Sequence, residues 1–202
     1  MSGFDAVLEY WLEPEPTTQA AVDERRRFWF NGGAAVDREI GERFGALVQR
    51  GCRGELDAWS ESPRGALALI IILDQFPRNL FRGTAAAFAS DARALALAGA
   101  GFDAGWFSAF GTAERTFATL PFHHSENVED QKRGVTLSVQ TALRAPPHYL
   151  SFAISSVDAA RKHLDTVVRF GRFPHRNAAL GLASTPAELE YLEYLELAHQ
   201  WL

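Results

Sequence analysis

The most apolar run in the chain spans residues 66–73 and contains three consecutive isoleucines. Ser62 and Pro63, just before it, are typical of an N-cap and a first helical residue, and Pro77 disfavours helical dihedrals at Phe76. We therefore predict a helix of about 13 residues between Ser62 and Phe76. The isoleucines would also suit a strand, but the length of the segment and its cap favour a helix. Because this helix has no polar face, other elements must surround it.

A carboxylate follows the apolar run on its inward side. Asp74 lies one turn after Ile70, so its side chain is expected to point into the interior. A buried carboxylate is costly unless a cation or a hydrogen-bond donor compensates it. The nearest candidates along the chain are Arg78, Asn79 and Arg82. Such a pair is either an internal tie that locks the turn or part of a functional site.

Apolar residues recur at helical spacing in most of the remaining chain, and no strand pattern is convincing. Further helices are predicted up to residue 12 and over about 18–30, 37–50, 84–99, 102–120 with a break near Gly111, 125–143, 148–170 and from 186 onward. Their expected N-caps include Asp37, Thr84, Ser125 and Thr185, and the expected stops include Pro121 and Gly171. Eight or nine helices with short connections predict an all-α fold of antiparallel helical hairpins, in one domain over residues 1–202.

Three consecutive arginines, Arg25, Arg26 and Arg27, lie near the end of the helix predicted over 18–30. The helix dipole favours positive charge at a helix C-terminus. We therefore interpret these arginines as a solvated C-terminal turn.

Composition and charge exclude several classes of protein. With 202 residues, 47% of them hydrophobic, the chain is long enough to bury a full core. The net charge of -5 combines both signs along the chain without a basic stripe, which argues against a nucleic-acid surface. The single Cys52 cannot form an internal disulfide, and neither a secretory signal nor a membrane-spanning segment is recognisable. We expect a cytoplasmic protein without membrane contact.

Three polar clusters interrupt the apolar pattern, each at the end of a predicted helix. The predicted ligand-binding cleft takes Asp74, Gln75, Arg78, Asn79 and Arg82 from the first cluster, His124, Ser125, Glu126 and Gln131 from the second, and His163, Arg172, His175, Arg176 and Asn177 from the third. If the helices pack as hairpins, their ends converge at one rim or in one cleft.

The residue types in these clusters suit a small anionic ligand. Arginine binds carboxylate or phosphate through two parallel hydrogen bonds, and free N–H groups at helix N-termini add to the attraction. The competing interpretation is a set of helix-end hydrogen bonds that fastens turns to the core. Asp74 or Glu126 together with His124 or His163 would also allow general acid–base chemistry.

A metal site is a weaker alternative. His123, His124 and Glu126 contain ligand-type atoms, but adjacent histidines usually diverge, and the chain has neither an HExxH motif nor a cysteine set. Ser125 lacks the GxSxG context of a nucleophile and suits an N-cap instead. We predict no metal or other cofactor and assign no catalytic residue.

Five pieces of sequence, spread over nearly the whole chain, can be compared with known families. They are FWF (28–30), LIIILDQFPRNLFRGTAAAFASD (69–91), ERTF (114–117), LPFHHSE (120–126) with Gln131, and RFGRFPHRN (169–177). Together they are similar to the bacterial DUF924 family of uncharacterised proteins. The resemblance implies a tetratricopeptide-like, all-helical fold with a superhelical arrangement. One departure is Leu182, which stands where the family pattern has an arginine after the HRN motif, so any contact made by that arginine is lost here.

The resemblance implies no activity, because no catalytic residue or substrate is established for the family. Two functional hypotheses remain open beside a third, in which the polar clusters are internal ties and the sequence does not reveal the role of the family. The first is a helical protein whose cleft binds a small anionic ligand, with or without a reaction on it. The alternative is a module that binds a protein or peptide partner without catalysis, and it rests on the analogy of fold alone.

Overall fold

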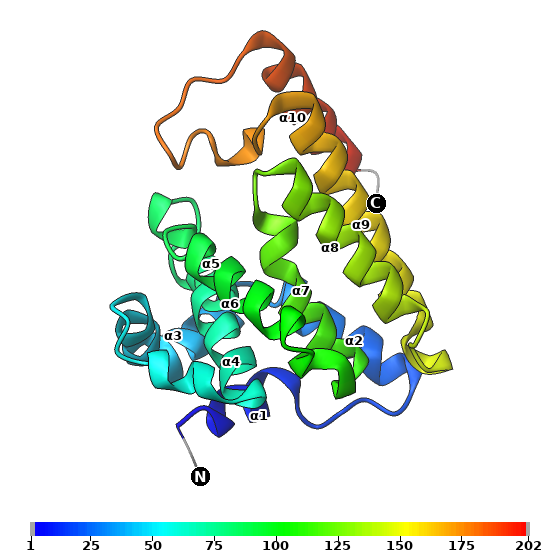
Figure 1. Ribbon diagram of the computed structural model, residues 1–202. Helices are drawn as coiled ribbons and strands as arrows, with labels where there is room; N and C mark the ends of the chain where they lie inside the picture. The colour runs from blue at the N-terminus through cyan, green and yellow to red at the C-terminus, as the bar shows by residue number, and fades with distance from the viewer. Residues whose placement is uncertain (1–2, 201–202) are drawn as a thin grey trace.

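The computed structural model describes residues 3–200, which are helical for most of their length (Figure 1). The α-helices are α1 (Asp5–Leu12), α2 (Gln19–Asn31), α3 (Gly33–Cys52), α4 (Pro63–Ile70), α5 (Phe76–Leu80), α6 (Asp91–Asp103), α7 (Thr112–His124), α8 (Val128–Ala142), α9 (Leu150–Phe170) and α10 (Pro186–Gln200). A π-helical turn (Ile71–Gln75) joins α4 to α5, and 3-10 helices occupy Asp57–Glu61, Ala85–Ala87, Trp106–Ala109, Pro147–Tyr149 and Pro174–Arg176. No β-strand occurs within residues 3–200, so the predicted all-α class is confirmed.

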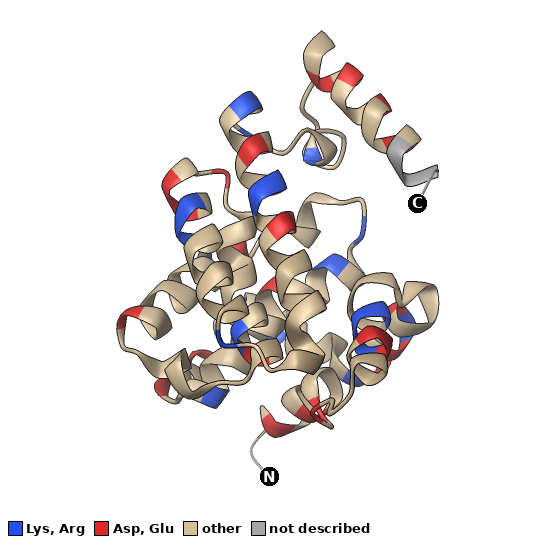
Figure 2. Ribbon diagram, turned by 90° about the vertical axis from the view of Figure 1, so that its right-hand side faces the viewer, with Lys and Arg blue, Asp and Glu red and all other residues tan. Residues whose placement is uncertain are grey.

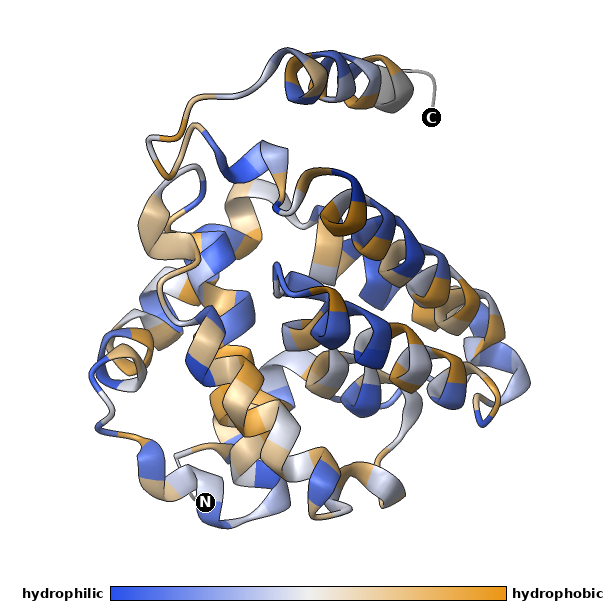
Figure 3. Cartoon of the chain, turned by 45° about the horizontal axis from the view of Figure 1, so that its top comes forward, coloured by the Kyte–Doolittle hydropathy of each residue, from blue (hydrophilic) through white to orange (hydrophobic). Residues whose placement is uncertain are grey.

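The segment formed by α4, the π-helical turn and α5, which we call the central rod, runs through the middle of the molecule. All side chains from Gly65 to Pro77 are buried. Helices α1, α3, α6 and α7 pack around the rod, and Figure 3 shows its apolar stretch at the centre of the chain. The prediction that other elements surround this helix is therefore confirmed.

The central rod does not end at Phe76, and this part of the prediction is wrong. The Phe76 N–H bonds to the carbonyl of Ile71, five residues back, so the helix widens into a π-helical turn. A new α-helical turn then starts at Phe76, and Pro77 lies in its first turn, where a missing N–H loses no hydrogen bond. The π-helical turn thus lets the helix continue past the proline.

Pro121 does not stop its helix either. Helix α7 continues through this residue to His124, because its packing against α6, α8 and α9 outweighs the cost of an interior proline, about 3 kcal/mol. As a result His123 and His124 lie in the last turn of α7 rather than in the following connection.

Three predicted N-caps are wrong, because each side chain is used elsewhere. Asn127 caps α8 by accepting hydrogen bonds from two backbone N–H groups, while the Ser125 hydroxyl donates to Asp130 Oδ2 at 2.7 Å. Thr84 donates to a backbone carbonyl and is followed by a 3-10 turn, so α6 begins only at Asp91. Asp37 lies inside α3, which begins at Gly33.

Two predicted helix signals are confirmed. Thr185 and Glu188 form a capping box at the start of α10, with the Thr185 N–H 2.7 Å from a Glu188 carboxylate oxygen. Gly171 ends α9 in the left-handed conformation, at a φ of 71°, which glycine adopts without steric cost.

The prediction of a solvated C-terminal turn for the three arginines of α2 is only partly correct, because none of them lies in the last turn and Arg25 is not solvated. Arg25 is half-buried and donates to the carbonyls of Trp11 at 2.6 Å and Tyr10 at 3.2 Å. Arg26 and Arg27 are exposed, one helical turn before the end of the helix.

Helices α7, α8 and α9 form an antiparallel layer beside the central rod. Figure 1 shows α8 running back along α7 and α9 returning along α8, with α10 beside the last turns of α9. This confirms the predicted hairpins, whereas the tetratricopeptide-like superhelix stays a prediction. Residues of both charges are interspersed over the face shown in Figure 2. Within residues 3–200, no helix is both long and apolar enough to span a lipid bilayer.

Phe117 joins α7 to the N-terminal helices. Its ring is fully buried and lies 5.0 Å from Trp29, 5.7 Å from Trp11 and 6.3 Å from Phe30, measured between ring centroids. Aromatic rings at these distances add to the free energy gained by burial alone. The wall that these rings form supports one side of the cavity described below.

We expect Phe117→Ala to lower the free energy of unfolding by about 3–5 kcal/mol, because a large buried ring leaves a cavity that the surrounding helices cannot fill. Urea unfolding followed by circular dichroism measures this. Val168→Ala, on the exposed face of α9, is the control and should change the stability by less than about 0.5 kcal/mol. Similar losses in both variants would contradict the role given to this ring.

Candidate functional site

Asp74 lies in the π-helical turn, and its side chain is fully buried. Its carboxylate accepts a hydrogen bond from His124 Nδ1 at 2.7 Å, lies 3.3 Å from Arg78 Nη1, and accepts another hydrogen bond from the Gln75 amide. Arg78 also donates to the Asp74 carbonyl. Arg78 was one of the partners expected from the sequence, whereas His124 comes from a helix 50 residues further along the chain.

In the pair formed by Asp74 and His124, the carboxylate is charged and the imidazole is neutral. Burial raises the pKa of Asp74, but His124, Arg78 and the hydrogen bond from Gln75 lower it by more, so the carboxyl stays ionised at neutral pH. Burial, followed by the nearby charge of Arg78, lowers the pKa of His124 to about 4. The imidazole is therefore neutral, and Nδ1 is its protonated nitrogen, because an ionised carboxylate can only accept.

A second acid, Asp91, binds the two arginines that follow the FP dipeptides. Its Oδ2 lies 2.8 Å from Arg78 Nη2 and 3.4 Å from Arg176 Nη1. Both guanidinium groups also stack over Phe88, at 5.6 and 4.7 Å from the ring centroid. The DQFPRN and RFPHRN segments, about 98 residues apart in sequence, therefore meet at one carboxylate.

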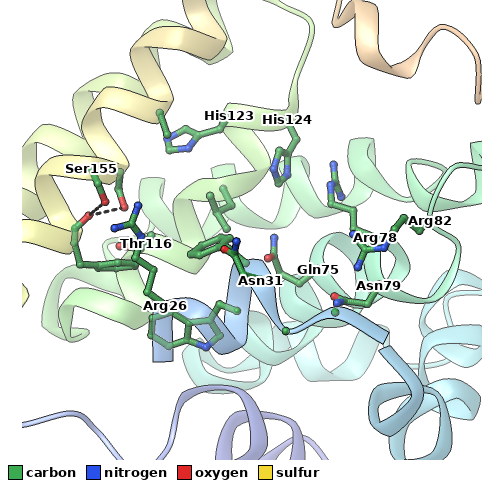
Figure 4. Close-up of a pocket in the computed structure, with 18 of the residues that line it drawn as sticks. Arg26, Asn31, Gln75, Arg78, Asn79, Arg82, Thr116, His123, His124 and Ser155 are labelled. Carbon is green, nitrogen blue, oxygen red and sulfur yellow. Dashed lines mark hydrogen bonds between the residues drawn. The ribbon is translucent and has the colours of Figure 1, made fainter. Parts of the chain in front are cut away.

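The Asp74–His124 pair borders a cavity of about 880 Å³ between the central rod, α2, α7 and α9. In Figure 4, His123 and His124 reach toward it from α7, Gln75, Arg78 and Asn79 from the central rod, and Arg26 and Asn31 from α2. Trp29, Phe30, Leu120 and Phe152 supply its apolar wall. A volume of this size falls in the range of small-molecule sites.

A smaller cavity of about 290 Å³ adjoins the first. Arg78, Arg82, His124 and His163 border both cavities. Phe88, Phe173, His175 and Arg176 complete the smaller one. The shared residues make one continuous polar wall between the two spaces.

The turn between α2 and α3 closes the large cavity on its polar side. Gly32, Gly33 and Ala34 border it, and Gly33 has a φ of 63°, which allows the sharp reversal between the helices. No side chain caps the N-terminus of α3, and its first turn contains no acidic residue. The first N–H groups of a helix have no acceptor within the helix, so this turn brings uncapped N–H groups and the positive end of the helix dipole to the border of the cavity.

Asp37, one turn further along α3, is compensated by the last turn of the central rod and by the turn that follows it. Its carboxylate accepts hydrogen bonds from Asn79 Nδ2 at 2.8 Å and from Arg82 Nη2 at 2.9 and 3.0 Å. Arg26 has no ion pair with any residue in the range 3–200 and borders the same cavity. Among the cations of the cavity wall, it is the one whose charge no described side chain offsets.

Nine of the predicted site residues gather around the two cavities. They are Asp74, Gln75, Arg78, Asn79, Arg82, His124, His163, His175 and Arg176. Residues far apart in the chain, near 76, 124 and 176, are therefore neighbours, as the sequence analysis required.

The other five predicted site residues, Ser125, Glu126, Gln131, Arg172 and Asn177, fasten turns to the core. Glu126 Oε1 accepts from the Phe173 N–H at 2.8 Å, and Gln131 donates to the His123 and Ser125 carbonyls at 2.7 and 2.6 Å. Arg172 holds Glu188 through two nitrogens at 2.6 and 2.8 Å, and the Asn177 amide donates to Ser184. Here the contacts are those of the competing interpretation, hydrogen bonds at helix ends.

Sequence reasoning missed four polar residues of this region: Arg26, Asn31, Asp37 and Asp91. For two of them, the sequence contained a feature that could have indicated the site. Asp91 is the last residue of the long motif 69–91, and the Asn31-Gly32-Gly33 sequence indicates a tight turn that would bring two helix ends together. Arg26 and Asp37 gave no such signal, because each also had an ordinary role at a helix terminus.

Two further histidines line the large cavity in neutral form. Burial lowers the pKa of His123 and of His163 to about 4 in each case. His123 Nε2 lies 2.9 Å from the Ser138 hydroxyl, so its ring is held toward α8. In the described part of the chain, no three His, Cys, Asp or Glu side chains lie close enough together to hold a metal ion.

Comparison with known proteins places this architecture in a family. The family described as "Bacterial protein of unknown function (DUF924)" matches residues 7–195. The chain belongs to the DUF924 family. A solved structure titled "Structure of Protein of Unknown Function ATU0120 from Agrobacterium tumefaciens" is similar to this DUF924 chain, with a TM-score of 0.79 and 36% sequence identity, over 95% of this chain and 97% of that one. No curated protein matches this DUF924 sequence. Function must therefore be argued from the site itself.

The buried histidines predict how stability depends on pH. A histidine whose pKa is about 4 when folded and 6.5 when unfolded favours folding above pH 6.5, and this contribution is lost as the pH falls from 6.5 through 4. His163→Gln should therefore reduce the slope of unfolding free energy against pH in this window, by at most roughly 1.4 kcal/mol per pH unit.

Urea unfolding at half-unit pH steps between 4 and 7 measures the slope. Ser155→Ala is the control, because it changes the wall of the same cavity without removing a titrating group. Equal slopes in His163→Gln and wild type would show that this histidine is not held neutral by burial.

Proposed function

We propose that this DUF924 protein binds a small organic anion in the larger cavity. The observation that carries the proposal is that the uncapped N-terminus of α3 and the unpaired Arg26 border one cavity with an aromatic wall. Backbone N–H groups at a helix N-terminus and a guanidinium group are both strong ligands for carboxylate or phosphate.

The balance of charge supports an anion rather than a neutral ligand. Among the residues lining the cavity, Arg26, Arg78 and Arg82 are cationic and Asp37 is the acid. Asp37 offsets Arg82, and Asp74 and Asp91, which lie behind the wall, together offset Arg78 and Arg176. The charge of Arg26 and the dipole of α3 remain, and a bound anion would compensate both.

The apolar wall supports a ligand that carries a hydrophobic body. Trp29, Phe30 and Phe152 lie on the side of the cavity formed by α2 and α9. Trp29 and Phe30 also pack on Phe117, so this wall is held in place by the core. A ligand with its charged group toward α3 and an aromatic or aliphatic group toward these rings would satisfy both sides of the cavity.

The proposal predicts a hierarchy of affinities. Phenyl phosphate and 3-phenylpropionate should bind more tightly than phenol, which lacks the charge, and than inorganic phosphate, which lacks the apolar group. Isothermal titration calorimetry at low ionic strength measures all four. Phenol binding as tightly as the two aromatic anions would contradict the proposal.

Arg26→Gln should weaken binding of the aromatic anions by about 10- to 150-fold, because a charge-assisted hydrogen bond contributes roughly 1.5–3 kcal/mol. Arg27→Gln, the neighbouring exposed arginine outside the cavity lining, is the matched control and should leave the affinity within about twofold. Equal losses in the two variants would indicate non-specific attraction to the surface of α2 instead of a site.

A further inference from the structure

We propose that His124 is a general base that acts on the bound ligand or on a water beside it, and that Asp74 is its positioning residue. The inference rests on the proposed function for the identity of the ligand class and adds a chemical step to it. Its basis is the geometry of one buried hydrogen bond and the position of the ring between two cavities.

The orientation of the imidazole follows from its bond to Asp74. His124 Nδ1 lies 2.7 Å from Asp74 Oδ1, so Nδ1 carries the proton and the lone pair is on Nε2. Nε2 makes no hydrogen bond to any residue in the range 3–200, and the ring borders both the large and the small cavity. The unprotonated nitrogen is therefore the part of the ring that is available to a ligand.

Both members of the pair are held firmly. Asp74 is fixed in the π-helical turn by Gln75 and Arg78, and its carboxylate is inaccessible to water. The backbone carbonyl of His124 accepts a hydrogen bond from Arg176 Nη2 at 3.0 Å. A base must lie in a fixed place to accept a proton efficiently, and these contacts provide that.

The groups that face His124 come from every element packed around it. They are Asp74 from the π-helical turn, Arg78 from α5, His123 from α7, His163 from α9 and Arg176 from the turn after α9. Burial and the two arginines keep the imidazole unprotonated in the free protein, with a pKa of about 4. An anion bound beside it would offset the arginines and raise the pKa toward neutrality, so the base would gain strength when the ligand is present.

The step is a single proton transfer. The Nε2 lone pair takes the proton of an O–H group, on water or on the ligand, and the oxygen keeps the bonding electron pair as a nucleophile. The imidazolium that forms is stabilised by the Asp74 carboxylate, as in other His–Asp pairs. The same proton returns from Nε2 to an oxygen of the ligand or of the water, which restores the neutral ring.

Nitrogen-15 NMR of the histidine side chains in the wild-type protein tests the orientation without any ligand. We expect His124 to be the Nδ1–H tautomer at pH 7, and its titration to move to higher pH when phenyl phosphate is added. The Nε2–H tautomer would overturn the proposal, because the nitrogen facing the cavities would then be a donor.

Diethyl pyrocarbonate, which acylates an unprotonated imidazole nitrogen, tests the availability of Nε2. The rate of modification of His124, followed by peptide mass spectrometry, should fall by about tenfold in Asp74→Asn, since the correct tautomer and the charge beside it are lost. Asp130→Asn is the matched control, because Asp130 accepts the Ser125 hydroxyl and does not touch His124. Resistance of wild-type His124 to the reagent, or equal rates in the two variants, would overturn the proposal.

These outcomes separate the two proposals. Failure of the aromatic anions to bind, with the Nδ1–H tautomer and reactivity intact, would contradict the proposed ligand class alone. Tight anion binding with the Nε2–H tautomer would contradict the proposed base alone. The tautomer measurement needs no substitution, so it decides the question even if Asp74→Asn does not fold.

Discussion

A carboxylate with no access to water, that of Asp74, constrains the rest of this structure. Burying an isolated ion costs several kcal/mol, and the cost is repaid only when its oxygens are fully bonded. Here the bonds come from Gln75, Arg78 and His124, which belong to two different parts of the chain. The requirement to compensate one charge therefore determines how α7 lies against the central rod, and with it the position of the cavity.

The compensation of charge extends outward from Asp74 through a series of ion pairs. Arg78 is shared between Asp74 and Asp91, and Asp91 in turn binds Arg176. Stacking on Phe88 places both guanidinium groups over an apolar surface, which is possible because a guanidinium group is weakly hydrated on its faces. The result is a chain of alternating charges across the centre of the molecule, with the neutral His124 at the edge that faces the cavities.

The helical architecture could be predicted from the sequence because it depends on local patterns. The apolar run 66–73, the stop at Gly171 and the capping box at Thr185 each act within a few residues, and each was confirmed. Pro77 and Pro121 were wrongly read as stops, because proline limits a helix only where tertiary packing or a π-helical turn does not compensate for it. That packing involves residues far apart in the chain, so the local preference of proline could not predict it.

The site was predictable in part for a similar reason. Arg78 was expected as a partner of Asp74 because it is among the nearest candidates along the chain, but nothing local connects Asp74 with His124 or Arg78 with Asp91. Glu126 and Arg172 have the same chemistry as the cavity residues, and only their neighbours, Phe173 and Glu188, show that they fasten turns. The residue types thus showed which charged side chains need a hydrogen-bond or ion-pair partner. Which partner each of them has depends on the tertiary fold.

The pairing of Arg176 with Asp91 has a consequence for the order of assembly. During synthesis Asp91 emerges 85 residues before Arg176, and Glu126 emerges 47 residues before the Phe173 N–H that it binds. A nascent chain that has reached Gly171 already contains helices α1 to α9, yet Asp91 and Glu126 each still lack one hydrogen-bond donor that arrives later. The short segment after Gly171 supplies the donors that these acids lack. The smaller cavity therefore takes its final form only when that segment packs against the rest of the protein.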